Sequence, residues 1–302
     1  MTTQPKPFLS LKARDALFGY LFVAPQVIGF LLFVVGPLVA VVIYSFESRN
    51  MLSGLTMPAG LSNYTRMVEG DPLFPTVLNN SLIFTAGLVP LNLIIALVLA
   101  VMLHRPMPGV TLFRTLYFAP VVTSAAAWAI VWRFILQGED GTLNQFLAQV
   151  GINGPNWLRE PGWAMFAVIF TRVLKSVGLN MIIFLAALQN IPREYDEAAM
   201  VDGASGVERF FKITIPLLSP TILLVTVLTI IGSLKIFDHI VLMTNGGPAN
   251  ATLVLVNYIY FQAFKVFNTG YASALSVVLF VLALLATVIQ WTLRKSFVYS
   301  ER

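Results

Sequence analysis

Few residues of this sequence have the types and spacing that enzymatic chemistry needs. The chain contains no cysteine, no glycine-rich phosphate loop and no Gly-Lys pair, so neither a disulfide nor a Walker-type nucleotide site is expected. The two histidines, His104 and His239, lie in different segments without metal-ligand companions, and no Ser/His/Asp constellation can be assembled. We therefore expect no catalytic residue, and no metal or cofactor bound by this chain.

Charged side chains inside apolar segments are the next candidates for function. An ionised group at the centre of a membrane helix costs about 2.5 to 3.5 kcal/mol on insertion scales, so it must face protein or water. Arg172 and Lys175 lie one turn apart in one segment, and Lys235 and Asp238 lie three residues apart in another. We predict that these four residues border a wet substrate path. A local ion pair between Lys235 and Asp238 that only structures its helix remains an open alternative. Arg133, near the end of its segment, is expected to reach the interface instead.

The densest charge in the chain lies between residues 190 and 216. Only 11% of the 302 residues are charged. Eight of them fall in this stretch: Arg193, Glu194, Asp196, Glu197, Asp202, Glu208, Arg209 and Lys212. The segment must lie in water, and its pattern predicts two short helices around a turn. The first is expected to begin at the N-cap Asn190 and to end near Asp202, where Gly203 can turn the chain at positive φ.

The second helix of this stretch is predicted to start at a capping box and to end at a proline. Ser205 and Glu208 form the box, Glu208 and Lys212 form an i,i+4 pair, and Pro216 closes the unit. Small and apolar side chains are available for a partner surface: Ala198, Ala199, Val207, Phe210, Phe211 and Thr214. A passive connecting loop needs no such surface, so the pattern favours a helix pair that docks on another protein.

The sequence EAAMVDG, then nine residues, then ITIP resembles the signature of bacterial ABC importer permeases: Glu-Ala-Ala, three residues, Gly, nine residues, Ile-x-Leu-Pro. Ile215 stands where that signature has leucine. The matching positions are Glu197, Ala198, Ala199, Gly203, Ile213 and Pro216. The resemblance implies that these residues, with Phe210 and Phe211, couple the chain to a cytoplasmic ATPase subunit, which would bind ATP and Mg²⁺. It also implies a second homologous permease, two ATPase subunits, one extracytoplasmic binding protein and the all-α type I importer fold.

Composition independently indicates an integral membrane protein. Hydrophobic residues make up 57% of the chain, and its mean hydropathy is +0.80. Six apolar segments are long enough to cross a bilayer. They cover residues 17–46, 76–103, 113–136, 163–188, 217–243 and 271–293. Residues 47–75 and the TNGGPANAT sequence have the chemistry of loops.

The expected organisation is one six-span permease domain between two short tails. The domain covers residues 17–295 and includes the coupling loop 190–216, with tails at 1–16 and 296–302. Prolines and glycines are expected to kink the first span: Pro25, Gly29, Gly36 and Pro37. If both tails are cytoplasmic, eleven Lys and Arg residues lie inside and four outside. This bias follows the positive-inside rule, and it places the coupling loop in the cytoplasm of a bacterium, with the chain in the inner membrane.

The substrate is predicted from a second resemblance. The opening YLFVAPQVIGFLLFVVGPLV, the segment from Lys235, KIFDHIVLMTNGGP, and then TLVLVNYIYFQAF and GYASALS resemble permeases that import sugars, sugar oligomers or glycerol phosphate. A neutral sugar suits aromatic faces with hydroxyl and amide partners, whereas a phosphate needs surplus positive charge, which Arg172 and Lys175 offer. A sugar is therefore the predicted substrate, and glycerol-3-phosphate or a related polyol phosphate is the alternative. An ion-coupled secondary transporter is the alternative of another class, but Asp238 is the one carboxylate in the apolar segments.

Overall fold

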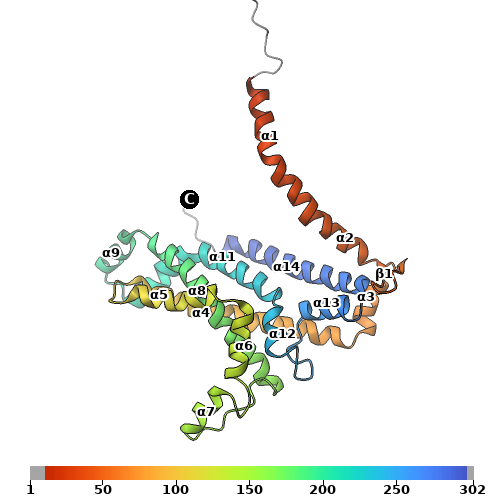
Figure 1. Ribbon diagram of the computed structural model, residues 1–302. Coiled ribbons are helices and arrows are strands. Elements are labelled where there is room, and N and C mark those ends of the chain that lie inside the picture. The colour runs from red at the N-terminus through yellow and green to blue at the C-terminus, as the bar shows by residue number, and fades with distance from the viewer. Residues whose placement is uncertain (1–10, 298–302) are drawn as a thin grey trace, which may run out of the picture.

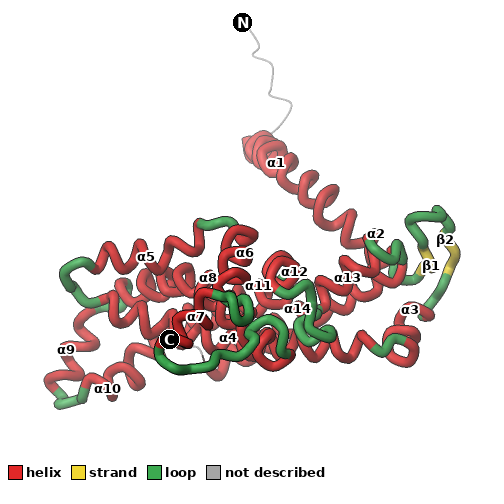
Figure 2. The backbone as a smooth tube through the Cα atoms, turned by 60° about the horizontal axis from the view of Figure 1, so that its bottom comes forward, coloured by secondary structure: helices red, strands yellow, loops and turns green. Residues whose placement is uncertain are grey.

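The structure, a computed structural model, describes residues 11–297, so tail residues 1–10 and 298–302 lie outside the described part. Most of the described chain is helical, and Figure 2 shows its two short strands paired at one end of the bundle. The long helices and their immediate neighbours are α4 (Leu73–His104), α5 (Val110–Val122), α8 (Pro161–Gln189), α11 (Ile215–Leu234), α13 (Leu255–Phe264) and α14 (Thr269–Phe297). The predicted all-α membrane fold is confirmed.

Helix α8 is the centre of the bundle, because 61% of the residues in its 18-residue apolar stretch are buried. Small residues explain how its neighbours reach it. A Cβ built at Gly178 would lie 2.0 Å from the carbonyl oxygen of Tyr117, so only glycine lets α5 approach this closely. On α4, Ala96 and Ala100 are fully buried in one cluster with Phe184 of α8. Close approach through small residues is the usual basis of helix packing in membranes.

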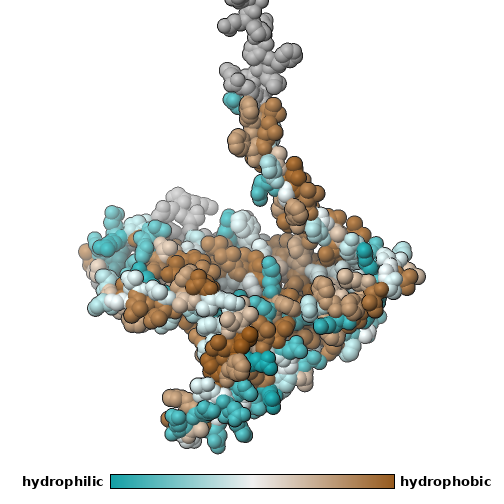
Figure 3. Space-filling model, in the orientation of Figure 1, coloured by the Kyte–Doolittle hydropathy of each residue, from teal (hydrophilic) through white to brown (hydrophobic). Residues whose placement is uncertain are grey.

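The first span is a separate arm that leaves the bundle (Figure 1). It consists of α1 (Leu11–Phe30), the π-helical turn η1 (Leu31–Val35) and α2 (Gly36–Tyr44). None of the residues in its 18-residue apolar stretch is buried, and its visible surface is largely hydrophobic (Figure 3). Pro25 lies inside α1, and the irregularity comes just before Pro37, where the Gly36 N–H bonds the Leu31 carbonyl five residues back. A proline has no N–H for the regular ladder, and the wider turn accommodates it.

The predicted third span is not a continuous helix. It consists of α5 and α6 (Ala125–Ile135), which are bent by 101° at the break around Thr123 and Ser124. Helix α6 packs against α12 (Asp238–Met243), and α6 and α7 (Thr142–Gln149) point away from the long helices (Figure 1). Hydropathy registers only that the segment is apolar, so it cannot detect a sharp bend. The predicted third span over residues 113–136 therefore corresponds to a bent helix pair.

The predicted fifth span is also broken. Helix α11 ends at Leu234, and α12 begins four residues later at Asp238, so residues 217–243 are not one helix. Helix α13, which the sequence did not predict, precedes the last span and packs on α14 and α4. With the bent pair counted once, the described residues hold five continuous span candidates and a sixth that is bent, which matches the predicted count of six.

The segment predicted as a loop between the first two spans is ordered by hydrogen bonds. Strands β1 (Glu47–Arg49) and β2 (Thr56–Pro58) pair antiparallel, and α3 (Ser62–Thr65) and the π-helical turn η2 (Arg66–Gly70) follow. Asp71 then accepts hydrogen bonds from the hydroxyls of Tyr258 and Tyr271, at 2.6 and 2.5 Å. Through this buried carboxylate the start of α4 is fixed to α13 and α14.

Candidate functional site

The first helix of the charged pair is α9 (Arg193–Val201), and α9 ends in a complete Schellman motif. Gly203 has φ +80, its N–H bonds the Met200 carbonyl at 3.0 Å, and the Ala204 N–H bonds the Ala199 carbonyl at 2.9 Å. The predicted turn at Gly203 is thus confirmed. The expected N-cap was wrong: Pro192 occupies that position, and Asn190 is instead the C-cap of α8.

The second helix starts as its sequence predicts. Ser205 and Glu208 form the reciprocal capping box of α10 (Gly206–Arg209), and Lys212 Nζ lies 3.4 Å from Glu208 Oε1. The helix does not end at Pro216, however, because the π-helical turn η3 (Phe210–Thr214) carries it directly into α11. Pro216 lies in the first turn of α11, where its missing N–H is tolerated. The pair is therefore continuous with the fifth span.

One ion pair joins the two helices of the loop and was missed by the sequence reading. Arg209 Nη1 lies 2.7 Å from Asp196 Oδ2, across the Gly203 turn. The Asp196 carboxylate is more than half exposed and Arg209 is more sheltered, so the pair fixes the angle between the helices more than it adds stability. Opposite charges on helices joined by a tight turn were the available signal.

The matched motif residues are distributed between a solvent-facing surface and a groove. Glu197, Ala198 and Phe211 are exposed, whereas Phe210 is partly buried with its ring 5.0 Å from that of Phe211. Ala199, Ile213 and Pro216 are partly buried, and Gly203 is exposed. A groove of about 370 Å³ lies beside the pair and is lined by Glu197, Phe210 and Ile213 together with the end of α4. The loop thus presents the exposed Phe211 side chain beside a groove that is partly lined by apolar side chains.

In the interior, Lys175 has a definite set of partners. Its Nζ donates to the carbonyl oxygens of Pro120 and Thr123, each at 2.9 Å, and lies 6.0 Å from the centre of the Trp128 ring. The side chain is buried at 7% exposure. Carbonyls at the end of α5 lack helical partners, and the ammonium group supplies the missing donors. Lys175 therefore holds the bend between α5 and α6.

The other predicted path residues are not arranged as their spacing suggested. Arg172 of α8 is partly buried and interacts electrostatically with Asp238 of α12. Lys235 caps the end of α11 and is exposed, and it does not form an ion pair with Asp238. The expected shared helix face of Lys235 and Asp238 was wrong because the chain breaks between them. The structure instead brings Arg172, Lys175 and Asp238 close enough for their charges to interact.

Uncharged polar residues that the sequence reading missed complete this interior. His239 is fully buried, with Nε2 2.8 Å from Thr171 Oγ1 of α8. Further along α8, Asn180 donates to both Asn92 of α4 and Thr229 of α11. Polar side chains in hydrocarbon must find partners, and these three helices satisfy one another. Asparagine and threonine inside apolar segments were the only signal in the sequence.

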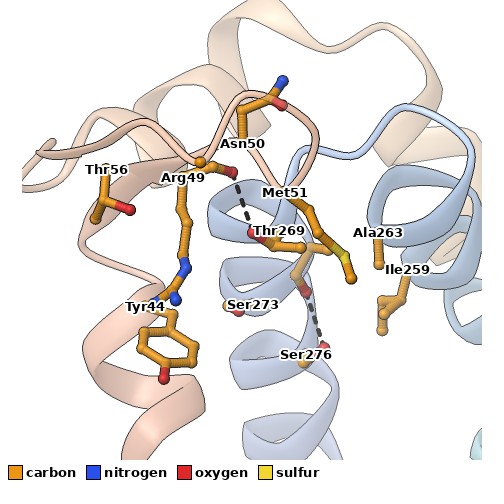
Figure 4. A pocket seen from close by; sticks show the side chains of 12 residues that line it. Tyr44, Arg49, Asn50, Met51, Thr56, Ile259, Ala263, Thr269, Ser273 and Ser276 are labelled. Carbon is orange, nitrogen blue, oxygen red and sulfur yellow. Dashed lines mark hydrogen bonds between the residues drawn. The ribbon is translucent and has the colours of Figure 1, made fainter.

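A further cavity of about 450 Å³ lies where α2, the hairpin, α13 and α14 meet, and it contains none of the predicted residues (Figure 4). Arg49 stacks over the Tyr44 ring at 4.1 Å, and its carbonyl accepts from Thr269 Oγ1 at 3.1 Å. Ser273 and Ser276 continue the wall along α14. The arm and the bundle are joined here.

Fold and site together define a class: a multi-pass membrane protein with a charged helix pair at one end of its long helices and a polar interior. Residues 92–297 match the family described as "Binding-protein-dependent transport system inner membrane component". The lactose transport system permease protein LacF of Rhizobium radiobacter is 37% identical, covering 93% of this chain and 95% of LacF. The arabinooligosaccharides transport system permease protein AraP of Bacillus subtilis (strain 168) is 34% identical, covering 96% and 91%.

A solved structure of a bacterial alginate ABC transporter, bound to its periplasmic protein with an alginate pentasaccharide, has the same fold. Its matched chain has a TM-score of 0.82 at 22% identity, with 96% of this chain and 97% of that chain covered. The present chain belongs to the family of binding-protein-dependent transport system inner membrane components. It is a transmembrane permease subunit of an ABC importer, and ATP hydrolysis resides in partner subunits rather than in this chain. Membership also sets aside the ion-coupled transporter.

Proposed function

We propose that this permease imports a neutral sugar or short saccharide across the bacterial inner membrane by alternating access. The observation that carries this proposal is the combination of relatives whose names specify lactose and arabinooligosaccharides with an interior rich in aromatic, amide and hydroxyl groups. Its partners would be a second homologous permease, two ATPase subunits that bind ATP and Mg²⁺, and an extracytoplasmic binding protein.

The coupling part of the proposal assigns the ATPase contact to the helix pair and to the groove beside it. The residues of this contact are Glu197, Ala198, Ala199, Gly203, Phe210, Phe211, Ile213 and Pro216. The Schellman turn, the capping box and the Asp196–Arg209 ion pair hold the helix pair in one shape, so little conformational entropy is lost when it docks. Its continuity with α11 supports direct transmission of ATPase movement to the interior.

Orientation is a separate part of the proposal and rests on the charge bias. With both termini cytoplasmic, the hairpin lies outside and α9 lies inside. A cysteine at exposed Ser53 should react with an impermeant maleimide added to intact cells, and a cysteine at exposed Glu194 should react only after permeabilisation. The reverse pattern would invert the topology and remove the coupling assignment.

The substrate path is proposed at the three interacting charges around α8. Arg172, Lys175 and Asp238 would border the path where α5–α6 and α11–α12 are broken, and exposed Lys235 would lie at its edge. Asp238→Asn combined with Lys235→Gln should change uptake kinetics or selectivity, while assembly and ATP hydrolysis persist. Unchanged kinetics would assign both residues a structural role, since they do not pair with each other.

The proposed function is tested by uptake in proteoliposomes that hold this permease with its partner permease, ATPase subunits and binding protein. Radiolabelled lactose, arabinotriose and glycerol-3-phosphate should be compared, each with ATP inside and with ATP omitted. The proposal expects ATP-dependent accumulation of at least one saccharide. A glycerol-3-phosphate or related polyol-phosphate substrate is the second candidate, because Arg172 and Lys175 give the interior two cations near a single carboxylate, Asp238.

A further inference from the structure

Aromatic rings form an unbroken row along the N-terminal half of α8. The row begins at Trp157, in the loop before the helix, whose ring centre lies 5.0 Å from that of Trp163. Phe166 follows at 5.9 Å from Trp163, and Phe170 follows at 6.1 Å from Phe166 in a stacked arrangement. Positions 163, 166 and 170 recur at helical spacing, so one face of α8 carries the rings.

The row continues across to α6 and ends at the polar interior. The Trp132 ring lies 6.0 Å from Phe170, and the Trp128 ring lies 5.8 Å from Trp132. Trp128 donates its indole N–H to the Thr171 carbonyl at 3.0 Å, and Lys175 Nζ stands 6.0 Å from its ring centre. We call the six rings, Trp157, Trp163, Phe166, Phe170, Trp132 and Trp128, the aromatic row.

The row is both anchored and accessible. At its outer end, Trp157 donates to Asn144 Oδ1 at 2.7 Å, which fixes the first ring to the α7 loop. Its middle rings remain open within this chain: Trp163, Phe166 and Phe170 are 42%, 48% and 43% exposed. The bend of 101° turns α6 away from the long helices and leaves this face of α8 only partly covered. Four of the five tryptophans of the chain lie in the row.

We infer that the aromatic row is a stacking track along which the rings of a neutral saccharide pass from the extracytoplasmic side to the polar centre at Lys175. This inference rests on the proposed sugar-import function and names where the saccharide binds. Aromatic faces carry partial negative charge and attract the C–H faces of sugar rings, and no charged side chain interrupts the row. The Lys175 ammonium at its inner end, 6.0 Å from the Trp128 ring centre, would then receive the sugar hydroxyls.

Two other occupants would leave the same face exposed in this chain. Lipid could cover it, with Trp157 and Trp163 as interfacial anchors, or the second permease could pack on it. Neither occupant explains why the row of rings leads to the Lys175 ammonium. Lipid contacts require only apolar volume, which leucine supplies, and packing of the second permease would show as altered assembly, whereas a sugar track requires the flat ring faces for uptake. Ring removal at constant apolarity therefore separates the three.

The experiment compares Phe166→Leu/Phe170→Leu with the parent importer, assembled with its partner permease, ATPase subunits and binding protein in proteoliposomes. The KM for arabinotriose uptake should rise about five- to tenfold, from the loss of two stacking contacts. The rise should be smaller for lactose, which has fewer rings. Phe166→Tyr/Phe170→Tyr keeps both faces and should retain parental uptake. Phe261→Leu/Phe280→Leu, at 47% and 46% exposure away from the row, is the matched control.

Each outcome decides between the occupants. Parental saccharide kinetics in the double leucine variant would overturn the track while leaving the sugar importer intact. Poor assembly of that variant, with rescue by tyrosine, would assign the row to permease packing. An equal loss for lactose and arabinotriose would do the same. If the parent accumulates glycerol-3-phosphate or neither saccharide, the proposed substrate class fails, and the track fails with it.

Discussion

The charged helix pair and the interior around α8 both concentrate polar groups, but these groups find their hydrogen-bond partners in opposite ways. In the pair, the bonds are local: Ser205 with Glu208, and Gly203 with Met200. In the interior, Lys175 bonds carbonyls more than fifty residues away, and Asn180 joins three helices. Water can replace a lost partner only in the first region. The same substitution should therefore cost little in the pair and much around α8.

The largest effect is expected at the closest contact with α8. In Gly178→Ala the new Cβ would meet the Tyr117 carbonyl oxygen at 2.0 Å, and backbone must shift. We expect a loss of about 3 kcal/mol in the free energy of unfolding. Thermal unfolding of the purified permease complex measures it. Gly232→Ala is the control, because nothing lies within 4 Å of its added Cβ. Equal stability of the two variants would mean that α5 and α8 do not pack this tightly.

A lysine exchange compares the two regions directly. Lys175→Met removes the charged donor that the carbonyls of Pro120 and Thr123 share in a partly buried site. The Pro120 carbonyl keeps the Thr123 hydroxyl as a donor, whereas the Thr123 carbonyl loses the ammonium, and we expect a loss of about 2 kcal/mol. Lys212→Met removes an exposed i,i+4 pair and should change stability by at most about 0.5 kcal/mol. Denaturant unfolding in the same detergent gives both values. Similar costs at the two sites would break the distinction drawn above.

An alanine exchange tests the turn of the docking pair. Gly203 has φ +80, so Gly203→Ala should cost about 1 kcal/mol locally and lower ATPase stimulation by loaded binding protein. Gly206→Ala, three residues on in the first turn of α10, should be neutral or slightly stabilising. ATP hydrolysis by the reconstituted importer is the readout. Full stimulation in Gly203→Ala would argue against coupling through this turn.

The smallest effect concerns acid stability at Asp71, where buried and local bonding combine. Burial raises the pKa of its carboxyl, but hydrogen bonds from Tyr258, Tyr271 and the Leu73 N–H outweigh burial and hold the pKa below its usual value. This stabilisation is present above the unfolded value of about 3.9 and is lost as pH falls through the lower folded value.

The parent should therefore lose stability between about pH 5 and pH 3 more steeply than Asp71→Asn. The unfolding temperature measured across this range shows the difference. Glu69→Gln, which removes an exposed acid nearby, controls for the change in net charge. If Asp71→Asn and the parent have parallel pH profiles, the two tyrosines do not stabilise the ionised carboxylate.

The sequence by itself determined the membrane class, the number of spans and the helix pair. Each depends on neighbours in the chain: long apolar runs for the spans, Gly203 for the turn, and Ser205 with Glu208 for the cap. Its errors were also local. Asn190 resembled an N-cap, and Pro216 a stop, because the competing geometry of α8 and of η3 involves residues beyond the motif.

Only the tertiary structure decided how the interior is arranged. Residues 113–136 and 217–243 are predominantly apolar, and hydropathy is the same for a straight helix and a broken one. The α5–α6 bend is stable because a distant side chain, Lys175, donates to carbonyls that lack helical partners. No periodicity in the sequence connects Lys175 with Pro120. The aromatic row likewise exists only because the bend brings Trp132 of α6 to Phe170 of α8. Buried polar groups and stacked rings take partners by proximity in space, and the sequence order does not encode that proximity.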